Sequence, residues 1–306
     1  MSWVYRKQMI EGVSIPGIIH NGNYYFTQLA VYEDGTVSCW QKDDLPKFKR
    51  DVERGWVVSQ IPIGQELCVH GLADFPVKDA KWLYNKETYY RYIEDIVREL
   101  NPEMKNLYVE QPRVTKKWEE ARVSWWANPI DCKKKWDFGY DLYDGRSVYI
   151  FYQENGKLQL TFLTAYEDKT LLIDAKGDTY YTLDEILNMF DTGELCVSVE
   201  KETWVYIKGI GELLLAPPEY EGVELKEKKK EIVELVAEVS HESTAYDRCI
   251  NAYHAYLVEP TENARERLRE TYEEVPEHER MFLGDMDTRD SDIIRILEFP
   301  DRKREV

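Results

Sequence analysis

Runs of apolar residues at strand spacing dominate the first two thirds of the chain. Residues 24–32 and 158–166 are rich in aromatic, β-branched and other strand-compatible side chains, which fit a pleated surface. An Asn-Gly pair precedes each run, at residues 21–22 and 155–156. Asn-Gly is a strong hairpin signal because both residues accept positive φ. We therefore predict two antiparallel meanders of about three strands each.

The two meanders resemble each other in sequence. Residues 21–36 align without a gap with residues 155–170, with Asn-Gly, Leu, Tyr-Glu-Asp and Thr at matching positions. Farther on, Glu-Leu-Cys-Val occurs at residues 66–69 and again at 194–197. We interpret these two blocks as equivalent strands and residues 203–215 as a hairpin added to the second copy. Two collinear matches indicate an internal duplication.

Helical spacing replaces strand spacing between the copies and after residue 217. Residues 86–100 carry one apolar stripe, with Asn85 as a capping residue and a proline after the end. Residues 115–127 are a second helix candidate. Beyond a Pro-Pro pair at 217–218, four or five short amphipathic segments, about 85 residues in all, predict a small helical bundle.

These patterns predict an α+β fold with mostly antiparallel sheet. We expect a first β unit at residues 1–78, a Trp-rich helical connector at 79–138, a second β unit at 139–216 and an α-helical domain at 217–306. The sequence leaves open whether the two β units pack into one body.

The charge balance narrows the range of partners. The chain has 58 acidic and 40 basic side chains, a formal net charge of −18. Such a field repels nucleic-acid phosphates and anionic membranes and attracts a basic protein. We also find no apolar run that could cross a bilayer and no apolar segment typical of a secretory signal. We therefore expect a cytoplasmic protein that binds neither nucleic acid nor membrane.

Motifs for cofactors and covalent catalysis are missing from the sequence. The five cysteines form no CxxC pair, and no GxGxxG, GxxxxGK[ST] or GxSxG occurs. We expect most of the cysteines, Cys68 and Cys196 included, to be packed, and the repeated Asp34 and Asp168 to bond their own turns. We expect no cofactor, and these absences argue against an enzyme.

Four tryptophans suggest a site in the connector. Trp118, Trp125, Trp126 and Trp136 stand among polar residues, and exposed rings of this kind bind protein partners. The alternative is that these rings cover the seam between the two β units.

An acidic loop suggests a second site. Asp285, Asp287, Asp290 and Asp292 could offer oxygen ligands to Mg²⁺ or Ca²⁺, although the spacing fails the EF-hand pattern. Aspartates before a helix also stabilise its N-terminus, and a partner's basic residues could bind them too. With His278 nearby, the loop could serve a metal-dependent hydrolase.

The function expected from the sequence is non-catalytic protein binding inside the cell. An immunity-like or antitoxin-like inhibitor that masks a basic partner has this profile, by analogy. The alternative is the metal-dependent hydrolase. A third hypothesis, a mimic of nucleic acid, requires a continuous acidic face, whereas lysines and arginines interrupt the acidic residues almost everywhere.

Overall fold

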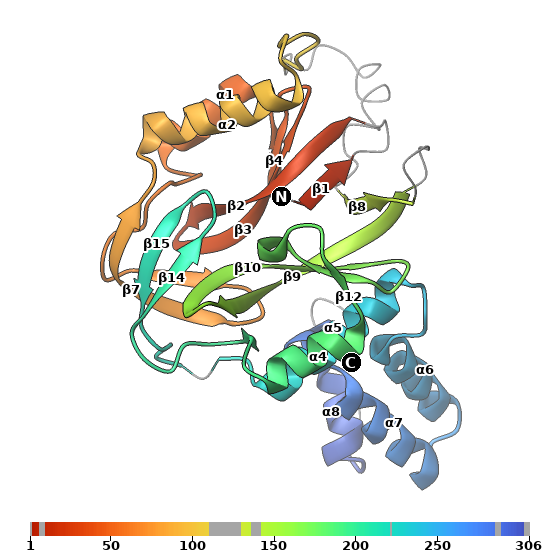
Figure 1. Ribbon diagram of the computed structural model, residues 1–306. Coiled ribbons are helices and arrows are strands. Elements are labelled where there is room, and N and C mark those ends of the chain that lie inside the picture. The colour runs from red at the N-terminus through yellow and green to blue at the C-terminus, as the bar shows by residue number, and fades with distance from the viewer. Residues whose placement is uncertain are drawn as a thin grey trace. The chain divides into compact units, whose positions relative to one another are not determined.

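The computed structural model describes residues 2–5, 10–109, 130–135, 142–220, 222–284 and 289–302 (Figure 1). The chain divides into two compact units, Met1–Val223 and Glu224–Val306. The first unit contains both predicted β units, and the second is helical. No helix in the described ranges is long and apolar enough to cross a membrane.

The strands of the first unit form one mixed sheet. Their bounds are β1 Ser2–Tyr5, β2 Glu11–Asn21, β3 Asn23–Tyr32, β4 Val37–Cys39, β5 Gln41–Asp43, β6 Glu66–Val69, β7 Ala73–Trp82, β8 Ile130–Lys134, β9 Leu142–Glu154, β10 Lys157–Tyr166, β11 Leu171–Ile173, β12 Tyr180–Tyr181, β13 Leu195–Cys196, β14 Thr203–Ile207 and β15 Gly211–Leu215.

Strand pairing closes this sheet into a ring. The order is β10, β14, β15, β7, β6, β3, β2, β1, β8, β9 and back to β10. Neighbours are antiparallel except for β3 with β6 and β10 with β14. The strands β4 and β5 extend from β3, the strands β11 and β12 extend from β10, and β13 pairs with β9. The predicted α+β fold with mostly antiparallel sheet is confirmed.

The internal duplication is visible in the pairing. Each copy has a long hairpin, β2–β3 or β9–β10, and then a short strand, β4 or β11. A parallel strand follows, β6 beside β3 and β14 beside β10, and an antiparallel return strand, β7 or β15, completes the copy. The copies meet twice around the ring, where β1 pairs with β8 and β7 pairs with β15.

The two Glu-Leu-Cys-Val blocks, however, are not equivalent strands. In the first copy, Leu67 of β6 pairs with Tyr24 of β3. In the second copy, Leu158 of β10 occupies the position of Tyr24, and it pairs with Val205 of β14. Leu195 instead pairs antiparallel with β9. The hairpin β14–β15 is therefore the counterpart of β6–β7 and not an addition. Burial decided this register, because β14 supplies side chains to the shared core at the positions that β6 supplies in the first copy.

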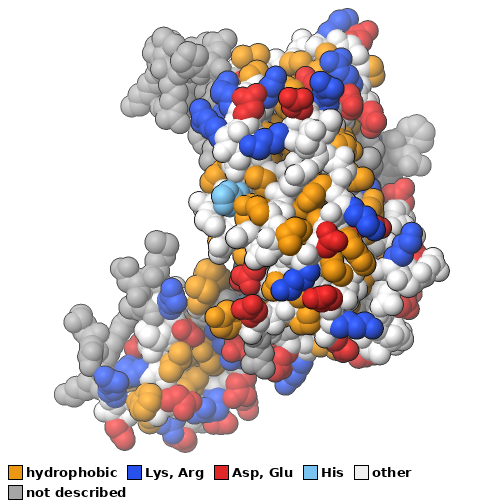
Figure 2. Space-filling model, turned by 90° about the vertical axis from the view of Figure 1, so that its left-hand side faces the viewer, with side chains coloured by type: hydrophobic (Ala, Val, Ile, Leu, Met, Phe, Trp, Pro, Cys, Tyr) orange, Lys and Arg blue, Asp and Glu red, His pale blue; other side chains and the backbone are white. Residues whose placement is uncertain are grey.

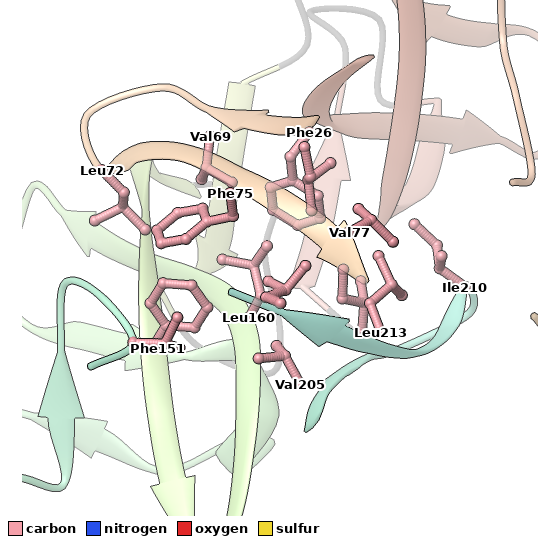
Figure 3. Close-up of a cluster of buried hydrophobic side chains, with 14 of the residues drawn as sticks. Phe26, Val69, Leu72, Phe75, Val77, Phe151, Leu160, Val205, Ile210 and Leu213 are labelled. Carbon is pink, nitrogen blue, oxygen red and sulfur yellow. The ribbon is translucent and has the colours of Figure 1, made fainter. Parts of the chain in front are cut away.

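The core inside the ring is shared by the two copies. Figure 3 shows Phe26, Phe75 and Val77 of the first copy facing Phe151, Leu160 and Leu213 of the second. Phe75 and Phe151 meet edge to face, with ring centroids 5.3 Å apart. Because each copy buries this inner face only against the other, the two β units form one body.

Helices cover the outer face of the first copy. The helices in the described part of the first unit are α1 Leu45–Arg54, α2 Lys86–Leu100 and α4 Leu183–Asp191, with a short 3₁₀ turn η2 at Asp174–Lys176. The helices α1 and α2 lie side by side over β2 and β3 (Figure 1) and bury Phe48 and Ile93 against the outer side chains of these strands. The predicted helix at 86–100 is confirmed, and Asn85 caps it by accepting from the Thr88 N–H at 2.9 Å.

The second unit consists of short helices around a core of its own. They are α5 Leu225–Val239, α6 Ala245–Val258, α7 Glu262–Glu274, the 3₁₀ turn η3 Glu277–Phe282 and α8 Ser291–Glu298. The core includes Cys249, Leu268 and Ile296. Thr244 and Thr261 cap α6 and α7 with their side chains. The predicted C-terminal helical region is confirmed.

Candidate functional site

Two aspartates of the predicted acidic loop lie within the described residues. Asp290 occupies the N-cap position of α8, but its carboxylate accepts from the Tyr272 hydroxyl at 2.7 Å and not from the helix backbone. Asp292 accepts from the Tyr253 hydroxyl at 2.6 Å and from Arg295 Nε at 2.9 Å. These carboxylates link α8 to α6 and α7. Asp285 and Asp287 lie outside the described residues.

The remaining candidate residues are the four connector tryptophans and His278. Trp118, Trp125, Trp126 and Trp136 also lie outside the described residues. His278 Nε2 is 3.9 Å from a carboxylate oxygen of Glu231. Within the part of the chain that the structure describes, no group of three or more His, Cys, Asp or Glu side chains could hold a metal ion.

The cysteines are packed thiols. Cys39, Cys68, Cys132 and Cys249 are buried, Cys196 is partly buried, and none of the five forms a disulfide. Burial raises the pKa of Cys68 to about 12 and that of Cys196 to about 11. A thiol with a raised pKa stays protonated at neutral pH, so these side chains are poor nucleophiles.

The repeated aspartates stabilise turns, as their position suggested. Asp34 Oδ1 accepts from the Thr36 N–H at 3.1 Å and from its hydroxyl at 2.7 Å. Asp168 makes the same two bonds to Thr170, at 3.2 and 2.8 Å. The Asp-x-Thr motif is therefore a turn shared by both copies.

A buried carboxyl lies on the inner face of the ring. Asp131 of β8 accepts from Gln28 Nε2 at 2.9 Å and from Ser147 Oγ at 2.6 Å, and Ser147 also bonds Thr164 at 2.7 Å. Burial raises the pKa of Asp131 to about 6. The hydrogen bonds from Ser147 and Gln28 lower the pKa, but their effect is smaller than that of burial. Both oxygens already have donors and the side chain is buried, so this network holds β3, β8, β9 and β10 together.

The feature best placed for recognition is a set of three rings in the first copy, Tyr25, Trp40 and Trp56, which we term the aromatic surface. Trp40 lies between β4 and β5, and its ring is 5.4 Å from that of Tyr25 and 6.2 Å from that of Trp56, centroid to centroid. Trp40 is 57% exposed, whereas the other two are partly buried.

Backbone strain distinguishes Trp40 from other exposed apolar residues. Its φ is +48°, in the left-handed region that a bulky side chain rarely occupies. It forms the single-residue turn between Cys39 and Gln41, which pair across β4 and β5. Glycine or asparagine would fit this turn at lower cost. The chain therefore holds a large apolar ring in solvent at a position whose backbone disfavours it.

The second copy provides an internal comparison. Tyr25 of β3 lies beside Cys68 of the parallel strand β6, and Gln159 of β10 lies beside Tyr206 of the parallel strand β14. Tyr25 and Gln159 therefore occupy equivalent positions in the two copies. The Trp56 carbonyl accepts from the His20 N–H, and the Glu194 carbonyl accepts from the Gln153 N–H at the same place in the second hairpin. Trp56 therefore corresponds to Glu194. The same strand framework accepts polar residues at both positions, so this fold does not by itself require the aromatic surface.

Charged groups elsewhere on the protein stack on aromatic rings. Lys81 Nζ lies 4.3 Å from the Trp204 ring centroid, and Lys49 Nζ lies 5.3 Å from that of Tyr90. Among the described residues, no lysine or arginine stacks on the three rings of the aromatic surface.

The charges on the face drawn in Figure 2 are mixed. Acidic and basic side chains alternate there, with hydrophobic side chains between them. This face lacks the continuous acidic stripe that a mimic of nucleic acid would need.

The sequence pattern does not reveal the aromatic surface, because its three residues are far apart in the chain. Tyr25 lies within a strand and Trp56 just after a helix, where aromatic residues are common. Only the structure shows that the chain turns at Trp40, between the paired residues Cys39 and Gln41. The false match of the Glu-Leu-Cys-Val blocks also hid the correspondence of Trp56 with Glu194.

Comparison with known proteins gives a family. A family model described as a domain of unknown function, DUF7638, matches residues 2–104 and 134–243, more than half of the chain. The chain belongs to the DUF7638 family. The two matched segments correspond to the two copies of the β unit, which agrees with the duplication seen in the strand pairing. A second model, also a domain of unknown function, DUF7639, matches residues 244–304, which include α6 to α8. No curated protein matches the chain. No solved structure matches it either.

Proposed function

We propose that this DUF7638 protein is a non-catalytic, cytoplasmic protein-binding module, and that its partner binds at the aromatic surface. The observation that carries the proposal is the exposed and strained Trp40. A tryptophan in the left-handed region costs about 1–2 kcal/mol, and leaving its ring in solvent forgoes roughly 1.5–3 kcal/mol of burial. A partner that covers the ring recovers the second cost. Tryptophan and tyrosine are the residue types enriched at interface hot spots.

The charge of the chain supports a basic partner. A net charge of −18 attracts cationic proteins over a distance of about one Debye length, roughly 10 Å at 0.1 M salt. Once near, an arginine or lysine of the partner can stack on Trp40. An immunity-like inhibitor that masks a basic protein would use both contributions and needs no catalytic group, nucleic acid or membrane.

The substitution Trp40→Gly separates binding from folding. Glycine relieves the strain at φ +48°, which offsets the lost ring contacts, so we expect the melting temperature to stay within about 2 °C of the wild type. Binding should weaken by a factor of about 10 or more, since a buried hot-spot ring contributes upward of 1.4 kcal/mol. Tagged protein is used to capture partners from a lysate of the native host, and affinity for the captured protein is then measured at two salt concentrations.

Tyr220→Ala is the matched control. Tyr220 is also aromatic and more exposed, at 82%, but takes no part in the aromatic surface. The proposal requires one stoichiometric basic partner that the wild type and Tyr220→Ala retain and Trp40→Gly loses, with weaker binding at high salt. Equal retention by Trp40→Gly and the wild type would exclude the aromatic surface as the binding site.

A further inference from the structure

Three tyrosine rings and a carboxylate surround the ammonium group of Lys133. Its Nζ lies 4.3 Å from the ring centroid of Tyr180, 5.0 Å from that of Tyr166 and 5.3 Å from that of Tyr143. Asp168 Oδ2 is 2.7 Å away. Thr170 Oγ1 is also within hydrogen-bonding distance. The Lys133 side chain is only 13% exposed.

The carboxylate in this site divides its two oxygens between two roles. Asp168 Oδ1 holds the turn that both copies share, and Oδ2 contacts the ammonium group. Partial burial raises the pKa of Asp168, but the contacts of Lys133 and Thr170 with the carboxylate outweigh this effect and keep the pKa below its usual value, so Asp168 is ionised at neutral pH. The negative faces of the rings and the carboxylate converge on one point, which is the chemistry that binds ammonium ions in proteins.

The position of Lys133 gives the contact a structural consequence. Lys133 lies on β8, which pairs with β1 of the first copy through Asp131 and Ile130. The rings and the carboxylate belong to the second copy, on β9, at the end of β10 and on β12. The ammonium contact therefore fixes β8, one of the two places where the copies join.

We propose that Tyr143, Tyr166, Tyr180 and Asp168 form an ammonium-binding cage whose built-in ligand is Lys133. The ligand class is a primary alkylammonium group, and a free alkylammonium ion occupies the cage when the lysine side chain is cut back. This inference does not depend on the proposed binding function.

The test is chemical rescue of Lys133→Ala. This substitution removes three methylene groups and the ammonium group, and n-propylammonium has the same heavy atoms, three carbons and one nitrogen. We expect the variant to melt about 3 °C or more below the wild type and to regain much of that loss in roughly 50 mM n-propylammonium chloride. Equal concentrations of sodium chloride or n-propanol should not rescue it, because only the ammonium group satisfies the carboxylate and the rings together. If the variant does not fold without ligand, the yield on refolding in n-propylammonium replaces the melting temperature as the measurement.

Two further variants make the result specific. Lys176→Ala is the matched control, because Lys176 Nζ also contacts a carboxylate, that of Glu154 at 3.0 Å. Among the described residues, however, it lies over one ring, that of Tyr152 at 5.1 Å. It should show no rescue. Adding Tyr180→Ala to Lys133→Ala should abolish the rescue. The proposal is wrong if n-propylammonium stabilises Lys133→Ala no more than it stabilises Lys176→Ala.

Discussion

Replacing Phe151 with alanine is expected to destabilise both β units at once, by about 4 kcal/mol. Phe151 is fully buried on β9 and packs edge to face on Phe75 of β7. Removing a buried phenylalanine side chain costs about 3–5 kcal/mol, because the transfer free energy is lost and a cavity remains. The cavity lies in the core that the two copies share, so it destabilises both copies.

Hydrogen exchange followed by mass spectrometry measures this effect in each copy separately. In Phe151→Ala, exchange should accelerate equally in peptides from β10 and in peptides from β3, which belong to different copies. Phe75→Ala should give the same pattern. The double variant should differ from the sum of the single variants by about 1 kcal/mol, the coupling of a contacting aromatic pair. Faster exchange confined to the copy that carries the substitution would show that the two β units unfold independently, contrary to the shared core.

Replacing Asp131 with asparagine is expected to stabilise the protein at neutral pH and to have much less effect near pH 4. The pKa of the Asp131 carboxyl is about 6 in the folded protein, compared with 3.8 for an aspartate in the unfolded chain, because burial disfavours the charged form. The folded state thus binds the proton more tightly than the unfolded state. The associated stability is complete below about pH 4 and is lost as the pH rises through about 6. Two pKa units correspond to about 3 kcal/mol.

Asparagine can keep the hydrogen bonds of the network. Its carbonyl accepts from Gln28 Nε2, and its amide donates to Ser147 Oγ, which can donate in turn to Thr164. Urea unfolding from pH 4 to pH 8 should show a free-energy difference between variant and wild type that grows up to about pH 6 and then levels off. Asp43 has a pKa of about 6 as well, but it is present in both proteins, so its contribution cancels in the difference between their free energies of unfolding. A difference that is constant with pH would mean that Asp131 is not the group that titrates.

Local features of this protein were predictable because they depend on neighbouring residues. The bounds of α2 and its Asn85 cap follow from helical spacing and a side chain that reaches the first turn. Asn155 and Gly156 both have positive φ, as their hairpin signal requires. The turns at Asp34 and Asp168 follow from a carboxylate that bonds the backbone two residues on. The duplication was also visible, since residues 21–36 match residues 155–170 without a gap.

Tertiary structure decided what no local pattern encodes. Glu-Leu-Cys-Val recurs in the sequence, yet only burial against the other copy determines that β14 and not β13 corresponds to β6. The closure of the ring, the cage around Lys133 and the network of Asp131 join residues from distant strands. Trp40 reads as a strand residue, and its turn and exposure exist only because β4 and β5 pair on either side of it. The sequence by itself determined the local elements and their repetition, and packing between distant segments determined their register and the sites.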